Sequence, residues 1–139
     1  MSCRIGMHRR LNKARLSLPV RKRFEVELER LAQIDGQGFD PDEAVLILRI
    51  VGDLPGHVVP APFECLWRHA SDFLAACLMV AVADGRYSVE QARHISVLAS
   101  RLGRSAQQLA RIEADTLGRL EAQGWLLMRD GEGLAMSPT

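Results

Sequence analysis

The sequence has few cysteines, and their arrangement excludes a disulfide framework. Cys3, Cys65 and Cys77 form an odd count without regular spacing, whereas disulfide-rich domains carry paired cysteines in short secreted chains. Reduced thiols are the simpler interpretation, and we expect a cytoplasmic protein. Cys65 precedes His69 by four residues, but a helix would place Cys77 about 12 Å beyond Cys65, too far to share a zinc ion. We therefore expect buried thiols.

Long hydrophobic runs are also missing. The most apolar stretch, residues 73–83, is far shorter than the roughly 20 residues that cross a membrane. We expect no transmembrane segment and interpret this stretch as a helix buried on all sides. No apolar stretch follows the basic N-terminus, so no secretory signal is expected there. The chain has no P-loop, no Rossmann glycine pattern and no serine, histidine and acid arrangement, and we expect a protein that is not an enzyme.

Acidic residues are absent from the first 23 positions. This segment holds eight of the 18 basic residues, and the other ten share residues 24–139 with all 17 acidic residues. The near-neutral total of +1 therefore conceals a basic arm on an acidic body. Such an arm suits nucleic acid, an acidic protein face or anionic lipid, with a solvated terminus as the alternative. The candidate binding residues are Arg4, Arg9, Arg10, Lys13, Arg15, Arg21, Lys22 and Arg23.

Helix-start signals recur along the 139 residues, which are 47% hydrophobic and suit one globular domain. Ser17, Asp40, Ser88 and Ser105 are each followed by apolar residues at helical spacing. The second of these helices is expected to run to about Asp53. Residues 63–83 form one helix, or two that are broken at Ser71-Asp72.

The expected fold is all-α, a compact bundle of five or six helices in one domain. Residues 1–16 are assigned to the basic arm, 17–124 to the helical domain and 125–139 to a tail. The tail alternates around Asp130-Gly131 in the manner of a small β-hairpin. Trp125 at its start either caps the core or makes the hairpin a docking surface.

An internal repeat organises the helical domain. Phe39-Asp40-Pro41-Asp42-Glu43-Ala44 and Tyr87-Ser88-Val89-Glu90-Gln91-Ala92 match as aromatic, cap, apolar, acid, acid or amide, alanine. Continuing in register, Ile47 matches Ile95 and Ile50 matches Leu98. Each copy follows an apolar helix that ends in Asp-Gly, so we expect two helix–Asp-Gly–helix units packed around residues 73–83. Chance similarity between two capped amphipathic helices is the alternative.

The second copy resembles the TerB-like family, small helical domains named for bacterial tellurite-resistance operons. The resemblance rests on Phe73 to Ala92, which contains the Asp84-Gly85 step, and on the following helix that ends in Leu102-Gly103. It covers residues 73–112 well and 24–54 loosely, and it leaves out residues 1–16 and 125–139. It implies an all-α fold, no known catalysis, and roles in metal binding or as a scaffold in stress and phage-defence systems.

The resemblance also implies candidate metal ligands. They are Asp84 and Glu90 and, through the repeat, Asp35 and Asp42. The first copy departs from the family pattern by its Gln37-Gly38 insertion, which weakens the case for a second, symmetrical site. Two carboxylates would supply only part of the six to eight oxygens that Ca²⁺ takes. The alternative is that Asp84 shapes the turn and Glu90 complements a helix dipole, with no cofactor bound.

One further histidine and a rival fold stay open. His94 follows Glu90 by one turn and would either pair with it or join a metal site, and we expect a surface pair. Residues 98–126 together with the hairpin also resemble a winged helix-turn-helix. Two observations count against it: residues 103–124 are about one helical turn too long, and the would-be recognition helix has a net charge of −1, which opposes contact with phosphates.

These observations predict a non-enzymatic binding or scaffold protein of TerB-like type in a bacterial stress-response or phage-related system. A protein partner is expected, nucleic acid is an option through the basic arm, and a homodimer stays open. A weak divalent-cation site would be the only cofactor. The alternatives are a winged-helix DNA-binding regulator and a phage- or plasmid-encoded inhibitor.

Overall fold

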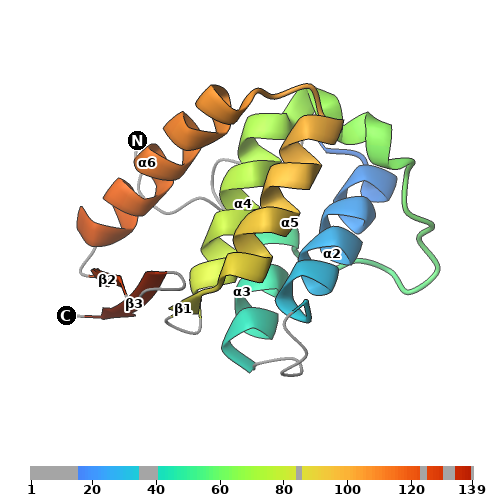
Figure 1. Ribbon diagram of the computed structural model, residues 1–139. Coiled ribbons are helices and arrows are strands. Elements are labelled where there is room, and N and C mark those ends of the chain that lie inside the picture. The colour runs from blue at the N-terminus through green and yellow to red at the C-terminus, as the bar shows by residue number, and fades with distance from the viewer. Residues whose placement is uncertain (1–15, 35–40, 84–85, 123–124, 130–133, 139) are drawn as a thin grey trace.

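The structure, a computed structural model, describes residues 16–34, 41–83, 86–122, 125–129 and 134–138 (Figure 1). Helices dominate it, and a small sheet lies at one end, so the expected all-α bundle is confirmed. In chain order the elements are α2 (Leu18–Ala32), α3 (Pro41–Val51), the 3₁₀ helix η2 (Phe63–His69), α4 (Ala70–Val82), β1 (Arg86–Tyr87), α5 (Val89–Arg101), α6 (Ala106–Ala122), β2 (Trp125–Arg129) and β3 (Leu134–Pro138).

Helix α4 is the centre of the bundle. Ten of its 13 residues are buried, and it contacts α2, α3, α5 and α6. The ring of Phe73 receives the edges of Phe24 and Phe63 at centroid distances of 5.2 and 6.3 Å, a favourable aromatic geometry. By length and composition alone residues 63–82 could cross a membrane, but most of this segment is buried inside the protein. Its apolar character is therefore accounted for by its position in the core.

Local signals begin the helices where the sequence predicts. The Ser17 hydroxyl accepts a hydrogen bond from the Val20 amide at 3.4 Å. At α5, the Ser88 side chain and the Gln91 side chain each bind the other's backbone amide at 3.1 Å. Ser105 begins α6 through the same reciprocal arrangement. These bonds satisfy amides that have no acceptor within the helix.

Two predicted boundaries are wrong. Helix α3 ends at Val51 rather than near Asp53, because Gly52 takes a positive φ of 81° and donates to the Leu48 carbonyl. That conformation is inexpensive only for glycine and ends the helix. The apolar segment 63–82 consists of two helices, and the second begins at Ala70 rather than at Ser71-Asp72. The first, η2, is a 3₁₀ helix that continues directly into α4.

The two copies of the repeat place matched residues in the core. Ile47 and Ile95 are buried, as are Ile50 and Leu98. Even the matched polar residues Glu43 and Gln91 are each only 2% exposed. Helix α2 contacts α3, and α4 contacts α5. The first pair also packs against α4, because both α2 and α3 contact it. This is the packing that the repeat predicts.

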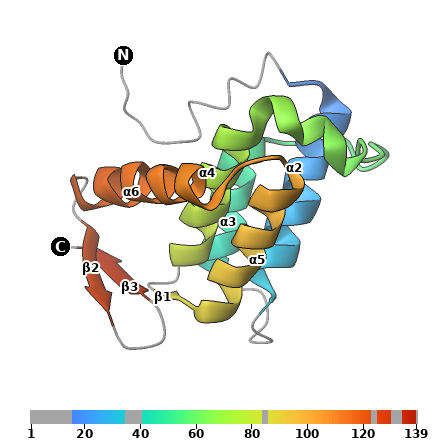
Figure 2. The ribbon, with the colours of Figure 1, turned by 45° about the horizontal axis from the view of Figure 1, so that its top comes forward.

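The C-terminal hairpin is present and belongs to a larger sheet. Strands β2 and β3 pair in antiparallel fashion, with Leu127 opposite Met136. The sequence did not predict β1, whose Tyr87 pairs with Leu134 of β3. The order β1-β3-β2 places the last strand in the middle, so the tail packs beside the segment that precedes α5 (Figure 2).

Candidate functional site

Three of the predicted partner-binding residues lie in α2 and make contacts within the protein. Arg21 donates from Nε and Nη2 to the Val51 carbonyl at 3.0 and 2.8 Å, which satisfies the C-terminal end of α3. Arg23 donates to the Ala61 carbonyl at 2.7 Å. Lys22 pairs with Glu25 at 2.7 Å, and this hydrogen bond raises the lysine pKa. Arg21 and Arg23 thus hold α3 and the connector before η2 against α2.

The other candidates in the basic arm, Arg4, Arg9, Arg10, Lys13 and Arg15, lie outside the described residues, as does the side chain of Trp125. Leu16, the last residue assigned to the arm, is buried in the core. The arm therefore enters the bundle at Leu16, directly before α2. Its binding role stays a prediction.

Of the four predicted metal ligands, Glu90 is the one whose side chain the structure describes. Glu90 is exposed in the first turn of α5. Asp35, Asp84 and the side chain of Asp42 lie outside the described residues. No group of three or more metal-ligating side chains occurs among the residues described. The cation site remains a prediction.

A buried carboxylate, which the sequence analysis did not single out, lies on α2. Glu27 is 2% exposed and forms ion pairs with Arg23 at 3.0 Å and Arg30 at 3.3 Å. A buried charge needs such partners because the interior solvates it poorly. The sequence signal for these ion pairs was the spacing, since Glu27 follows Arg23 by four residues and precedes Arg30 by three. Such alternating charges on a helix usually mark an exposed face, so the spacing did not indicate that Glu27 is buried.

The expected surface pair of His94 with Glu90 is wrong. His94 is half-buried, and its Nε2 atom is buried with no hydrogen-bond partner among the described residues. Burial lowers its pKa, while Glu27 raises it and Arg30 and Arg101 lower it. The charges that act on His94 are therefore those of Glu27 and Arg30 on α2 and of Arg101 on its own helix.

One end of the bundle carries an exposed tryptophan beside a shallow hollow. Trp67 of η2 is 58% exposed, and it lines a cavity of about 560 Å³ with Ser17, Val20 and Cys65. Cys65 is exposed rather than buried, which corrects one prediction, whereas Cys77 is buried as expected and burial raises its thiol pKa. The available sequence signal for the exposure of Trp67 was its place between Leu66 and Ala70. Both of these residues are buried, and Trp67 between them points outward.

A hydrogen bond joins strand β1 of the sheet to α6. The Tyr87 hydroxyl donates to Glu113 Oε2 at 2.8 Å. Tyr87 is buried, and burial followed by the Glu113 charge raises its pKa. One of the three acidic residues of α6 is therefore held against β1, a detail that the net charge of the helix conceals.

No family model, curated protein or solved structure matches the chain. The TerB-like and winged-helix resemblances therefore remain predictions. The candidate surfaces are thus defined by geometry: the hollow at Trp67, the polar cluster around Glu27, and the α5–α6 unit with its sheet.

Proposed function

We propose that this protein is a non-enzymatic binding module that acts through protein–protein contacts, of the TerB-like kind expected in bacterial stress-response or phage-related systems. The exposure of Trp67 carries the proposal. A tryptophan is among the largest apolar groups a protein has, and leaving more than half of it in water forgoes the burial that stabilises the fold.

The surroundings of Trp67 favour a protein ligand. Arg68 places its guanidinium carbon 5.9 Å from the centroid of the Trp67 ring, a cation–π arrangement. Tryptophan and arginine dominate the energetics of protein interfaces, where they fill and flank shallow pockets. The hollow of about 560 Å³ beside the ring can take one or two side chains of a partner.

The basic arm joins the body at the same place. Ser17 lines the hollow, and Arg15 precedes it by two residues. An acidic partner segment seated at Trp67 would thus lie within reach of the arm, and charge complementarity would speed its association.

The test is a comparison of tagged proteins purified from the native host. A partner that co-purifies with the wild type is lost with Trp67→Ala and retained with Leu48→Ala, which removes an equally exposed side chain (53%) from α3. Calorimetry with the purified partner should then show affinity lowered by about 30-fold or more for Trp67→Ala. Equal binding by both variants would refute this role for Trp67.

A divalent cation would tune the module under the TerB-like proposal. Glu90 lies in the first turn of α5, where its side chain also suits the helix dipole. Calorimetric titration of the full chain with Ca²⁺, Mg²⁺ and Zn²⁺ decides between these roles. Heat of binding that is absent from Glu90→Gln supports a site, and no binding up to millimolar concentration rejects it.

A DNA-binding winged helix is the second candidate, and the sheet topology favours it. Helices α5 and α6 are joined by four residues, of which Gly103 has a φ of +75°. A short turn with glycine is typical of the helix-turn-helix unit, and Figure 2 shows α6 crossing the direction of α5. The hairpin that follows α6 contacts it through β2 and pairs with β1, which precedes α5, and a wing would occupy this position.

The charge around the turn before α6 and in its first half moderates the objection from net charge. Residues 101–112 contain Arg101, Arg104 and Arg111 and no acidic residue, whereas the three acids lie at 113–121. The N-terminal residues of a recognition helix are those that contact base edges. Fluorescence anisotropy with duplex DNA at physiological salt tests this candidate: binding that is lost in Arg111→Gln supports it, and no binding rejects it.

A further inference from the structure

The three-stranded sheet has one long edge without a partner strand. In the order β1-β3-β2, strand β3 is central, and β2 pairs with β3 along one side. Figure 2 shows β2 running away from the end of α6 along the outside of the sheet. Among the described residues no strand pairs with the other side of β2. The amide and carbonyl groups of alternate residues of β2 therefore point away from β3 with no backbone partner in the sheet.

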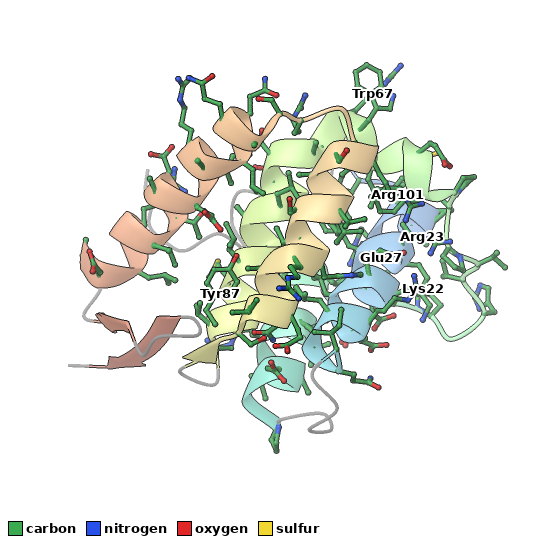
Figure 3. The ribbon with its side chains drawn as sticks, viewed as in Figure 1. Lys22, Arg23, Glu27, Trp67, Tyr87 and Arg101 are labelled. Carbon is green, nitrogen blue, oxygen red and sulfur yellow. The ribbon has the colours of Figure 1, made fainter. Side chains whose placement is uncertain are left out.

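The opposite end of the sheet is held against the bundle. Tyr87 of β1 is 5% exposed and donates its hydroxyl proton to Glu113 of α6, and Figure 3 shows Tyr87 beside the helices, at the end of the sheet away from β2. Strand β1 has only two residues and pairs with two of the five residues of β3. The rest of β3 ends in Pro138, which has no N–H to donate. Strand β2 thus offers the longest continuous edge to a further strand.

The composition of β2 lacks most of the features that protect an edge strand. Natural edges are commonly shielded by lysine, by proline, by a bulge or by very short length. The sequence of β2 is Trp125-Leu126-Leu127-Met128-Arg129. It contains no proline, glycine, lysine or acidic residue, and its one charge stands at the last position. Aromatic and aliphatic residues of this kind suit a strand that is paired on both sides.

We propose that a second copy of this chain adds its own β2 to this edge, which joins the two sheets into one antiparallel sheet across a two-fold axis. Such an interface uses the same surface on both subunits. A pair centred on Leu127 places this residue opposite its own copy. The next residues in this register are Leu126 opposite Met128, and the outermost are Trp125 opposite Arg129.

The charges of β2 fit this register and select a second copy as the occupant. At about 3.4 Å per residue the two copies of Arg129 stand about 14 Å apart along the strands, beyond the screening length of about 8 Å. Each arginine comes opposite a tryptophan, a favourable cross-strand cation–π pair. A parallel pair in register would instead place the two arginines side by side, where like charges repel. The strand is therefore complementary to itself in the antiparallel direction.

The proposal goes beyond the function proposed above, since it uses neither Trp67 nor the basic arm. A ribbon of two five-residue strands is smaller than the roughly 800 Å² per partner that stable complexes bury. We therefore expect a monomer–dimer equilibrium with a Kd of about 10–100 μM.

The first experiment is sedimentation equilibrium of the full chain at concentrations of about 5–500 μM. Each dimer contains two pairs of Trp125 with Arg129, so Arg129→Ala should weaken dimerisation about tenfold. The control is Arg49→Ala, which removes the same charge from an exposed position on α3 and should leave the Kd within about twofold. Trp67→Ala should also leave the dimer unchanged, which separates this test from that of the proposed function.

Hydrogen exchange locates the contact in the unmodified chain. The outward-pointing amides of β2 should exchange about fivefold more slowly at 500 than at 5 μM, because the added strand protects them, whereas the amides of α3 should exchange at one rate. Leu127→Lys and Leu127→Glu each place like charges opposite one another at the two-fold axis. Each variant should be monomeric alone, and an equimolar mixture should dimerise, with circular dichroism verifying that both are folded.

Four outcomes would overturn the proposal. A chain that stays monomeric at about 500 μM would leave the edge to a strand of another protein. A dimer in which the β2 amides exchange at the same rate at both concentrations would place the contact elsewhere. An equal loss in Arg49→Ala and Arg129→Ala would reduce the effect to net charge. A mixture of folded Leu127→Lys and Leu127→Glu that stays monomeric would exclude the symmetric register.

Discussion

The ion pairs of Glu27 offer the sharpest test of how this fold is held together. Replacing Glu27 by Gln keeps the size of the side chain and removes its charge. Arg23, with 19% of its side chain exposed, then keeps only neutral acceptors among the described residues, the Ala61 carbonyl and the amide oxygen of the new side chain, and its charge loses the carboxylate. The N–H₂ group of the new amide would also compete with the arginine N–H groups for the nearby acceptors, because both are hydrogen-bond donors.

The magnitude follows from the exposure of each partner. Removing one member of a buried ion pair generally costs about 3–5 kcal/mol, because the other charge is left without compensation. Arg30 is 57% exposed and can turn into water, so only Arg23 is left uncompensated. We therefore expect a loss of about 3 kcal/mol in the free energy of unfolding for Glu27→Gln, near the lower end of that range. For a chain of this length the melting temperature should fall by about 10 °C.

Urea denaturation followed by circular dichroism measures this loss, and Glu25→Gln is the matched control. Glu25 lies in the same helix, and its pair with Lys22 is partly exposed, at 24% and 28%. Such pairs contribute only about 0.2–1 kcal/mol. The double variant Arg23→Gln/Glu27→Gln should recover about 1–3 kcal/mol relative to the sum of the single losses. Equal losses for Glu27→Gln and Glu25→Gln, or strict additivity in the double variant, would refute the reasoning.

Three further predictions concern backbone, titration and the sheet. Gly103→Ala should lower the free energy of unfolding by about 1 kcal/mol, because φ at this residue is +75°. Gly118 lies in open space within α6, and Gly118→Ala should raise the free energy of unfolding by about 0.5–1 kcal/mol. Urea denaturation measures both changes. The pKa of His94 is lowered in the folded protein. As the pH falls, the unfolded chain therefore takes up a proton at this histidine before the folded protein does, and stability should fall as the pH drops below about 6.5. His94→Gln should reduce this decline in melting temperatures taken from pH 7.5 to 5.5. Tyr87→Phe removes the hydrogen bond to Glu113, and a loss of about 1–2 kcal/mol is expected by urea denaturation.

Much of the fold was predictable because its signals are local. Ser17, Ser88 and Ser105 cap helices through bonds to residues three positions away, and such bonds depend on little beyond the neighbouring residues. Helical periodicity likewise identified the core positions of both copies of the repeat. Where local geometry was less common the prediction was wrong, as at the left-handed Gly52 that ends α3 and the 3₁₀ turn of η2.

The candidate sites were predicted less well, since they depend on which elements meet. Arg21 and Arg23 belong to a run of basic residues that suggested a binding arm, yet their acceptors are carbonyls 30 and 38 positions away. His94 was paired in prediction with its neighbour on α5, but its Nε2 atom is buried and has no hydrogen-bond partner among the described residues.

The sequence by itself determined where helices begin, which apolar positions of the repeat are buried, and that basic charge gathers at the N-terminus, because each depends on neighbours within a turn or two. Only the tertiary structure decided which charges are used. It enclosed Glu27 between two arginines, stacked Arg101 on Phe63, and exposed Trp67 beside a hollow. A side chain's partners are set by segments far apart in the chain that packing brings together, and no local pattern records that meeting.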